Sequence, residues 1–151
     1  MVPIFVNTHR EPAITGARCQ AFGRALGAIL DERPERIGLV ASGGLSHDHH
    51  GSRAGFVDDR LDGWVLETLS RGRSERLAPV FAVQSDSAGG GTAEIRLWMM
   101  LGAACESLGA EARTVDYVQS FTVAAGMGFA TWAVEAAIAG SSYARLSAGR
   151  G

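Results

Sequence analysis

Apolar and polar positions follow two different periods along the chain, and these periods divide it into predicted helices and strands. Apolar residues spaced three or four positions apart predict helices over about residues 16–32, 58–70 and 93–108. Short apolar runs bounded by Gly, Pro or polar residues predict strands at residues 3–7, 36–41 and 112–119. The small-residue stretch 124–139 is predicted to be helical, and residues 140–151 to form a flexible tail.

Residues of the capping type stand where the predicted helices begin and end. The predicted N-caps are Thr15, Asp58 or Asp59, and Thr92, and the predicted stops are Pro34, Gly72 and Gly109. The first helix lies between two apolar strands, which is the order of a βαβ unit with parallel strands. We therefore expect an α/β fold, with a mixed or mainly parallel sheet covered by helices on both faces. A single domain over residues 1–139 fits this length.

Composition narrows the function classes. The 151 residues carry a net charge of −2, so the chain has no basic surface for nucleic acid. All 14 basic residues are Arg, and without Lys neither a P-loop nor Schiff-base chemistry is available. The two cysteines, Cys19 and Cys105, are predicted to be buried reduced thiols. No signal peptide or membrane span is recognisable, and we expect a cytoplasmic protein that binds neither nucleic acid nor membrane.

The sequence Ser-Gly-Gly-Leu-Ser-His-Asp-His-His over residues 42–50 follows a predicted strand. Ligands of open α/β sheets bind at the carboxyl edge of the strands, and glycine lets the backbone approach them closely. A histidine placed there can act as an acid, a base or a metal ligand, and His47 is the strongest candidate. The alternative is a solvated loop that happens to contain histidines, which is the favoured interpretation for His49 and His50.

A second motif, Gly-Gly-Gly-Thr-Ala-Glu-Ile-Arg-Leu-Trp over residues 89–98, places Glu94 in the first turn of a predicted helix. An acidic residue there can simply stabilise the helix dipole. It can also be the carboxylate of the two-histidine, one-carboxylate site that non-haem Fe(II) oxygenases use. Hydroxyl residues near 120 stand at the end of a predicted strand and could either bind substrate or have no functional role.

Five motifs occur in one order along the chain, and together they resemble the class III extradiol ring-cleavage dioxygenases of LigB type over about residues 2–135. They are Val-Pro-Ile-Phe-Val-Asn-Thr at 2–8, Arg-Cys at 18–19, Gly-Gly-Leu-Ser-His at 43–47, Glu-Ile-Arg-Leu-Trp at 94–98 and Ala-Gly-Met-Gly-Phe-Ala at 125–130. The Gly-Gly-Leu-Ser-His motif is the most specific of them.

The resemblance implies a non-haem Fe(II) enzyme of aromatic catabolism that cleaves a catechol-type substrate, such as protocatechuate or gallate, with dioxygen. It implies that His47 is the acid–base histidine that moves protons to and from the substrate and bound oxygen. Glu94 matches the carboxylate ligand of iron. Ser120 and Thr122 resemble the strand-end hydroxyls that contact substrate.

The same resemblance implies that two histidine ligands of the iron come from an N-terminal half that precedes these motifs. His9, His49 and His50 do not match those ligands. We therefore expect a truncated catalytic half that is inactive alone and that forms homo- or hetero-oligomers. Two alternatives stay open: a non-catalytic remnant or structural subunit that pairs with a complete homologue, and a metal hydrolase that uses Glu94 with the histidines of residues 47–50.

Overall fold

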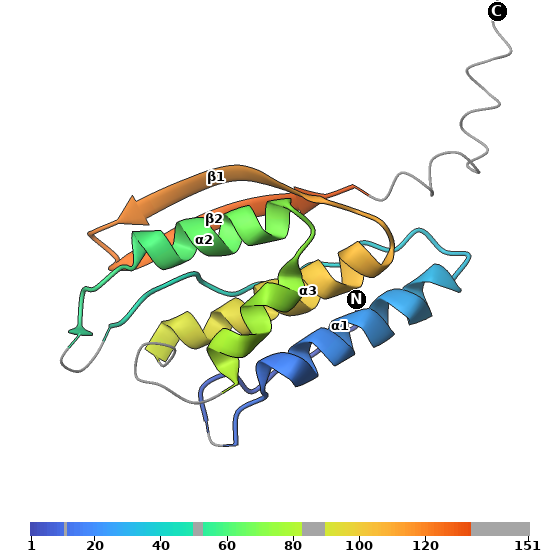
Figure 1. Ribbon diagram of the computed structural model, residues 1–151, viewed down its shortest axis with the longest axis horizontal. Helices are drawn as coiled ribbons and strands as arrows, with labels where there is room; N and C mark the ends of the chain where they lie inside the picture. Colours follow the sequence, from blue (N-terminus) through green and yellow to red (C-terminus); the bar gives the residue numbers. More distant parts are fainter. Residues whose placement is uncertain (11, 50–52, 83–89, 134–151) are drawn as a thin grey trace, which may run out of the picture.

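A computed structural model of the chain describes residues 1–10, 12–49, 53–82 and 90–133. The described elements are, in chain order, α1 (Gly16–Asp31), α2 (Asp59–Ser70), the 3₁₀ helices η2 (Ser74–Phe81) and η4 (Gly90–Glu94), α3 (Ile95–Ser107), β1 (Ala112–Ser120) and β2 (Ala125–Trp132). The two strands lie along one side of these elements and α1 along the other, with α3 between them (Figure 1). The predicted tail at 140–151 and the end of the predicted helix at 124–139 lie outside the described residues.

Helices α1 and α3 pack closely because α1 presents glycines to α3. A Cβ added at Gly23 would come within 2.7 Å of the Cβ of Ala103, and one added at Gly27 would overlap the backbone of Ala104. Absent side chains at these two positions let the helix backbones approach. The buried core extends from this contact to α2, η2 and the strands through Cys19, Leu45, Val65, Leu66, Leu69, Leu77, Phe81, Ile95, Met99, Met100 and Ala112.

Two predicted helix starts are confirmed, and the third is shifted. The Thr15 hydroxyl accepts a hydrogen bond from the Arg18 N–H, and the Asp58 carboxylate accepts one from the Leu61 N–H at 3.0 Å. The prediction of a Thr92 cap is wrong, because residues 90–94 form the 3₁₀ helix η4 and α3 starts at Ile95. Glu94 therefore stands at the N-cap position of α3, but its carboxylate makes no capping hydrogen bond.

The strand predicted at 112–119 is confirmed as β1, but it pairs with a segment that was predicted to be helical. β2 runs antiparallel to β1, from Ala112 opposite Trp132 to Ser120 opposite Ala125. Side chains of β2 alternate between the interior and solvent, with Gly126 buried and Met127 and Phe129 exposed. Small residues and glycines are compatible with either a helix or a strand. The hydrogen bonds to β1 stabilise the strand conformation.

The strands predicted at 3–7 and 36–41 are not formed. Neither segment pairs with a neighbouring strand among the described residues, and much of their apolar surface is exposed, as at Phe5 and Val40. An apolar run predicts that a segment needs a partner, but it does not say which partner supplies the hydrogen bonds. The described part of the chain thus contains one two-stranded antiparallel sheet, and it bears out neither a parallel sheet nor helices on both faces. Helices plus a sheet remain consistent with an α/β fold.

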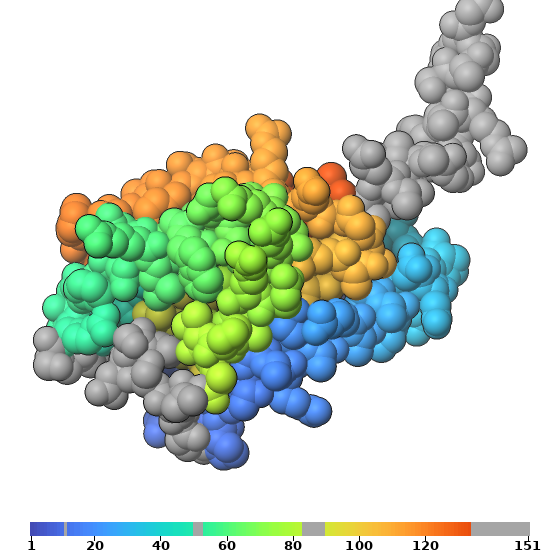
Figure 2. All heavy atoms as spheres, in the orientation of Figure 1, coloured from blue at the N-terminus to red at the C-terminus, as the bar shows by residue number. Residues whose placement is uncertain are grey.

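Helix α2 and η2 cover the front of the molecule between the strands and α1 (Figure 2). Inward-facing side chains of the hairpin, including Tyr117 and Trp132, pack against the core. The outward face of the hairpin is open, with Val115 and Phe129 more than half exposed. None of the helices formed by the described residues is long and apolar enough to cross a lipid bilayer.

Candidate functional site

The glycine-rich segment before His47 lies beside β2 and continues the hairpin by one short stretch. The Leu45 N–H donates to the Gly126 carbonyl at 3.3 Å, and the Gly126 N–H donates to the Ser46 carbonyl at 2.8 Å. His47 forms an isolated antiparallel bridge with Ala125. These backbone bonds place His47 next to the turn that connects the two strands.

The same segment is bound to the beginning of α3. The Gly44 N–H donates a 2.6 Å hydrogen bond to Oε2 of Glu94, and the indole N–H of Trp98 donates to the Gly43 carbonyl at 2.9 Å. A Cβ on Gly43 would come within 2.8 Å of the Leu97 side chain. The two glycines therefore allow a close contact that fixes the Glu94 carboxylate relative to His47.

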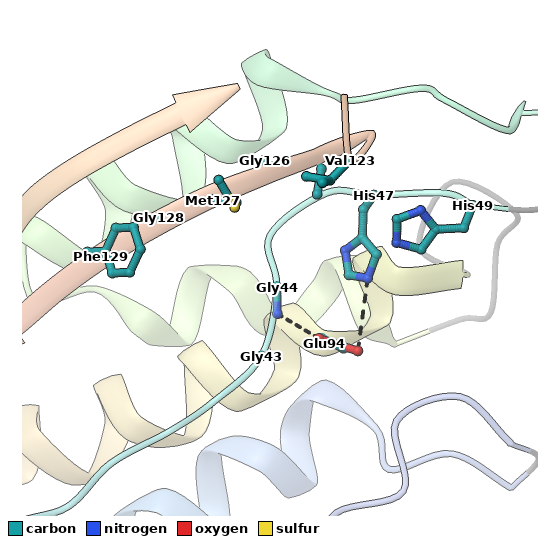
Figure 3. A pocket seen from close by; sticks show the side chains of 11 residues that line it. Gly43, Gly44, His47, His49, Glu94, Val123, Gly126, Met127, Gly128 and Phe129 are labelled. Atoms are coloured by element: carbon teal, nitrogen blue, oxygen red, sulfur yellow. Dashed lines mark hydrogen bonds and ion pairs between the residues drawn. The ribbon is translucent and has the colours of Figure 1, made fainter. Parts of the chain in front are cut away.

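His47 and Glu94 point toward each other (Figure 3). His47 Nδ1 lies 2.9 Å from the Leu45 carbonyl oxygen, and because a carbonyl only accepts, Nδ1 must carry the proton of this hydrogen bond. Nε2 then faces Oε1 of Glu94 at 4.0 Å. In the neutral imidazole this Nε2 has a free lone pair and can accept a proton.

Backbone without side chains surrounds the imidazole of His47 on two sides. A Cβ added at Gly44 would lie 2.6 Å from the ring, and one added at Gly91 would overlap it. Gly91 belongs to η4, so the glycine run that precedes Glu94 also makes room for His47. Both sequence motifs therefore meet at one imidazole.

Sequence reasoning set aside two further histidines that the structure brings to this site. His9 Nε2 lies 3.8 Å from Oε1 of Glu94, and its Nδ1 is 2.8 Å from the Thr8 hydroxyl. The ring of His49 lies 5.2 Å from the ring of His47. No periodicity or motif marks the contact of His9 with Glu94, because it depends on where the segment before α1 meets α3. His50 lies outside the described residues.

An open cavity of about 350 Å³ lies at this site. One end is lined by the polar groups of His47, His49 and Glu94, and the wall is formed by the turn and by β2. The wall residues are Val123, Ala125, Gly126, Met127, Gly128 and Phe129. The sequence pattern does not reveal this wall, because it predicts a helix over residues 124–139.

The two hydroxyl residues expected to bind substrate are close to the cavity but do not line it. Ser120 ends β1 opposite Ala125, and Thr122 is exposed in the turn. Their neighbours Val123 and Ala125 reach the cavity instead. A substrate contact by Ser120 or Thr122 stays a prediction.

A buried carboxylate lies directly behind the His47 segment. Asp62 of α2 is fully buried and accepts hydrogen bonds from the Ser46 N–H at 2.7 Å, the Ser46 hydroxyl at 2.9 Å and the Tyr117 hydroxyl at 2.8 Å. Burial raises the pKa of Asp62 above its ordinary value, and these hydrogen bonds counteract part of that rise. Burial and the Asp62 carboxylate together raise the pKa of Tyr117. The network joins α2, β1 and the His47 segment.

The described residues fit one ligand position of the expected iron site. Oε2 of Glu94 is bound by the Gly44 amide, while Oε1 faces the cavity and two imidazole Nε2 atoms. Nevertheless, no group of three His, Cys, Asp or Glu side chains among these residues is arranged to hold a metal ion. The described part of the chain therefore presents one carboxylate at the cavity but not a complete set of metal ligands.

Comparison with protein families gives a match over residues 1–130 to the catalytic LigB subunit of aromatic ring-opening dioxygenase. The chain belongs to the LigB family. This match confirms the resemblance that the five motifs indicated. The matched residues include both His47 and Glu94.

Individual LigB relatives are dioxygenases of aromatic compounds. Gallate dioxygenase of Pseudomonas putida is 30% identical over 103 residues, which are 67% of this chain and 30% of that protein. The 2,3-dihydroxyphenylpropionate/2,3-dihydroxicinnamic acid 1,2-dioxygenase of Comamonas testosteroni is 47% identical over 49 residues, or 32% of this chain and 15% of that protein. The enzyme of the same name from Photorhabdus laumondii is 45% identical over 73 residues, or 48% and 22%. The chain thus spans less than a third of the length of these curated relatives.

Proposed function

We propose that this chain is the part of a non-haem Fe(II) extradiol dioxygenase that supplies the acid–base histidine and the carboxylate ligand. The substrate is a catechol-type aromatic of the protocatechuate or gallate kind, and the second substrate is dioxygen. The observation that carries the proposal is the pairing of His47 with Glu94 at one end of an open cavity. Membership of the LigB family and the names of the relatives support it.

His47 acts as the proton carrier in this proposal. Its Nδ1–H is bound to the Leu45 carbonyl, so only Nε2 is available to a ligand in the cavity. Nε2 takes a proton from a substrate hydroxyl and returns it later to an oxygen of the product, as a general base and then a general acid. The backbone of Gly44 and Gly91 lies close to the imidazole, and in this proposal that packing preserves the orientation of the ring during both transfers.

Glu94 contributes charge rather than proton transfer. Its Oε2 is bound to Gly44, which leaves Oε1 as the oxygen that would bind iron. When bound, Fe(II) would coordinate the two catechol oxygens and dioxygen. Aromatic substrate would lie against the backbone and the apolar side chains of β2 that line the cavity.

The remaining iron ligands are two histidines that lie outside residues 1–151, in a segment that precedes this one in the intact enzyme. Two-histidine, one-carboxylate sites are common among non-haem Fe(II) oxygenases, and in this proposal Glu94 supplies the carboxylate. On this proposal the chain alone does not turn over, and it gains activity only beside that segment.

The test is a ring-cleavage assay in two parts. The purified chain is loaded anaerobically with Fe(II) and given protocatechuate, gallate or catechol with oxygen, and we expect no ring-cleavage product. The chain is then co-expressed with the N-terminal segment that precedes the matched region in gallate dioxygenase, and we expect product to form. His47→Gln and Glu94→Ala should each abolish that product, whereas Glu67→Gln, at an exposed carboxylate of α2, should not.

Two results would contradict the proposal. Product from the chain alone would refute the need for a second segment. Product from the complemented Glu94→Ala variant would refute the role of this carboxylate. The competing interpretation is a non-catalytic remnant or a structural subunit that pairs with a complete homologue, and the gene itself discriminates: an in-frame upstream segment with two histidines favours the enzyme.

A further inference from the structure

One peptide group separates the buried carboxylate of Asp62 from the imidazole of His47. The N–H of this group belongs to Ser46 and donates to Oδ1 of Asp62 at 2.7 Å. Its C=O belongs to Leu45 and accepts from Nδ1 of His47 at 2.9 Å. Because the peptide bond is planar and trans, these two hydrogen bonds point in opposite directions from one conjugated unit.

We propose that Asp62 is a positioning residue that fixes the proton of His47 on Nδ1 by acting through the peptide group between Leu45 and Ser46. A carboxylate that accepts from the N–H pushes electron density toward the carbonyl oxygen. The carbonyl then becomes a stronger acceptor, since hydrogen bonds in series polarise one another. A stronger acceptor at Nδ1 favours the imidazole tautomer with hydrogen on Nδ1 and a lone pair on Nε2.

The surroundings of Asp62 hold its carboxylate in one orientation. Oδ2 accepts from the Ser46 hydroxyl and from the Tyr117 hydroxyl, so both carboxylate oxygens are bound. The Ser46 hydroxyl in turn accepts from the Asp58 N–H at 2.8 Å, which directs its own hydrogen toward Asp62. A Cβ on Gly126 would overlap Oδ2, so the neighbouring strand packs directly on the carboxylate.

The network also explains why a charged group is buried at this place in the fold. A fully buried carboxylate without partners would be strongly destabilising, and here every partner is a donor. The helix α2 and the strand β1 thereby act on His47 although neither contributes a side chain to the cavity. The catalytic meaning of this positioning rests on the proposed role of His47, whereas the positioning itself is a property of the folded chain.

The test measures the tautomer of His47 directly, without iron or substrate. The chain is labelled with ¹⁵N in its histidine rings and studied by NMR at mildly alkaline pH. Comparison with His47→Gln assigns the signals of His47. We expect Nδ1 of His47 to carry the hydrogen in the wild-type chain, and a dominant Nε2–H tautomer would overturn the proposal.

The Asp62→Asn variant removes the charge and keeps the size of the side chain. We expect the ratio of the Nδ1–H to the Nε2–H tautomer to fall by up to roughly twofold, because each hydrogen bond in a series strengthens its neighbour by about 10–30%. The matched control is Glu106→Gln. Glu106 also accepts from a backbone N–H and a hydroxyl, both of Ser74, but has no bond to the His47 segment. An unchanged ratio in Asp62→Asn, or an equal fall in Glu106→Gln, would overturn the proposal.

Tyr117→Phe provides a test that does not depend on the folding of Asp62→Asn. Loss of the Tyr117 hydroxyl leaves more of the Asp62 charge for the Ser46 N–H, so the Nδ1–H tautomer should stay dominant or increase. A fall in the population of the Nδ1–H tautomer would refute the proposed action of Asp62 through the peptide group. These measurements are independent of turnover, so an inactive chain with the expected tautomer would count against the proposed function alone.

Discussion

The Gly44 amide and the Glu94 carboxylate, 50 residues apart in sequence, are joined by a hydrogen bond of 2.6 Å. This bond uses one carboxylate oxygen to bind the glycine turn to the start of α3 and leaves the other facing His47 and His9. Glu94 therefore has a structural contact at one carboxylate oxygen and, at the other, the position that we propose to bind iron. The two can be separated by substitution.

Glu94→Ala should lower the free energy of unfolding by about 1–3 kcal/mol, because the half-buried Gly44 N–H loses its acceptor. Glu94→Gln should change it by less than about 1 kcal/mol, because the amide oxygen still accepts. Urea unfolding measures both, with the exposed Glu67→Ala as control, for which we expect a change within about 0.5 kcal/mol. Equal stability of the Ala and Gln variants would show that the Gly44 contact does not stabilise the fold.

Gly91→Ala should displace the imidazole of His47, since the new Cβ would overlap the ring. Overpacking of this kind lowers the free energy of unfolding by about 1–3 kcal/mol. The change should appear in the NMR signals of His47 as well as in urea unfolding. Gly63→Ala is the matched control, because nothing lies near a Cβ at this exposed helical position, and there we expect a gain of about 0.5–1 kcal/mol. Unchanged His47 signals in Gly91→Ala would contradict the close packing.

Asp62 should make the chain less stable as the pH rises. Burial raises the pKa of Asp62 in the folded chain above the unfolded value of about 3.9, so the folded state binds this proton more tightly. Its contribution to stability is then complete below the unfolded pKa and is lost as the pH rises through the folded pKa. The difference in free energy of unfolding between wild type and Asp62→Asn should therefore decrease with rising pH.

Urea unfolding at a series of pH values from about 4 to 7 measures this difference. Glu106→Gln should show the same direction, because burial also raises the pKa of Glu106. A difference that is constant or increases with pH would mean that hydrogen bonding to the Asp62 carboxylate outweighs its burial.

The two thiols should be unreactive in the folded chain. Burial raises the pKa of both Cys19 and Cys105 to about 11, so almost no thiolate exists at neutral pH. A thiol reagent at neutral pH should label neither residue in the native chain and both in urea. Rapid labelling without denaturant would show that the packing of α1 on α3 opens readily.

The purified chain should self-associate. Phe5, Val40 and Phe129 are each more than half exposed, and exposed apolar surface promotes association. Size-exclusion chromatography over a range of concentrations should show species larger than a monomer. Phe5→Ser together with Val40→Ser should shift the profile toward the monomer, and a wild-type monomer at high concentration would contradict the expectation.

Local signals predicted much of the helical structure. The sequence predicts caps at Thr15 and at Asp58 or Asp59, because capping depends on a few neighbouring residues, and Thr15 and Asp58 accept the expected hydrogen bonds. Glu94 and His47 were singled out from their motifs, and the structure brings them together. Local signals do not predict pairing between distant segments. The composition of β2 also suits a helix, so its pairing with β1 was not predicted. The apolar runs at 3–7 and 36–41 indicate surface that needs burial, but they do not indicate which segment buries it.

The sequence by itself determined the family, the helix α1 with its cap, and the two motifs that carry the candidate chemistry. Only the tertiary structure decided that His9 reaches Glu94, that β2 forms the cavity wall and that Asp62 lies one peptide group from His47. The physical reason is the range of the interactions. Capping and periodicity act within one or two helical turns, whereas these contacts join residues brought together by packing.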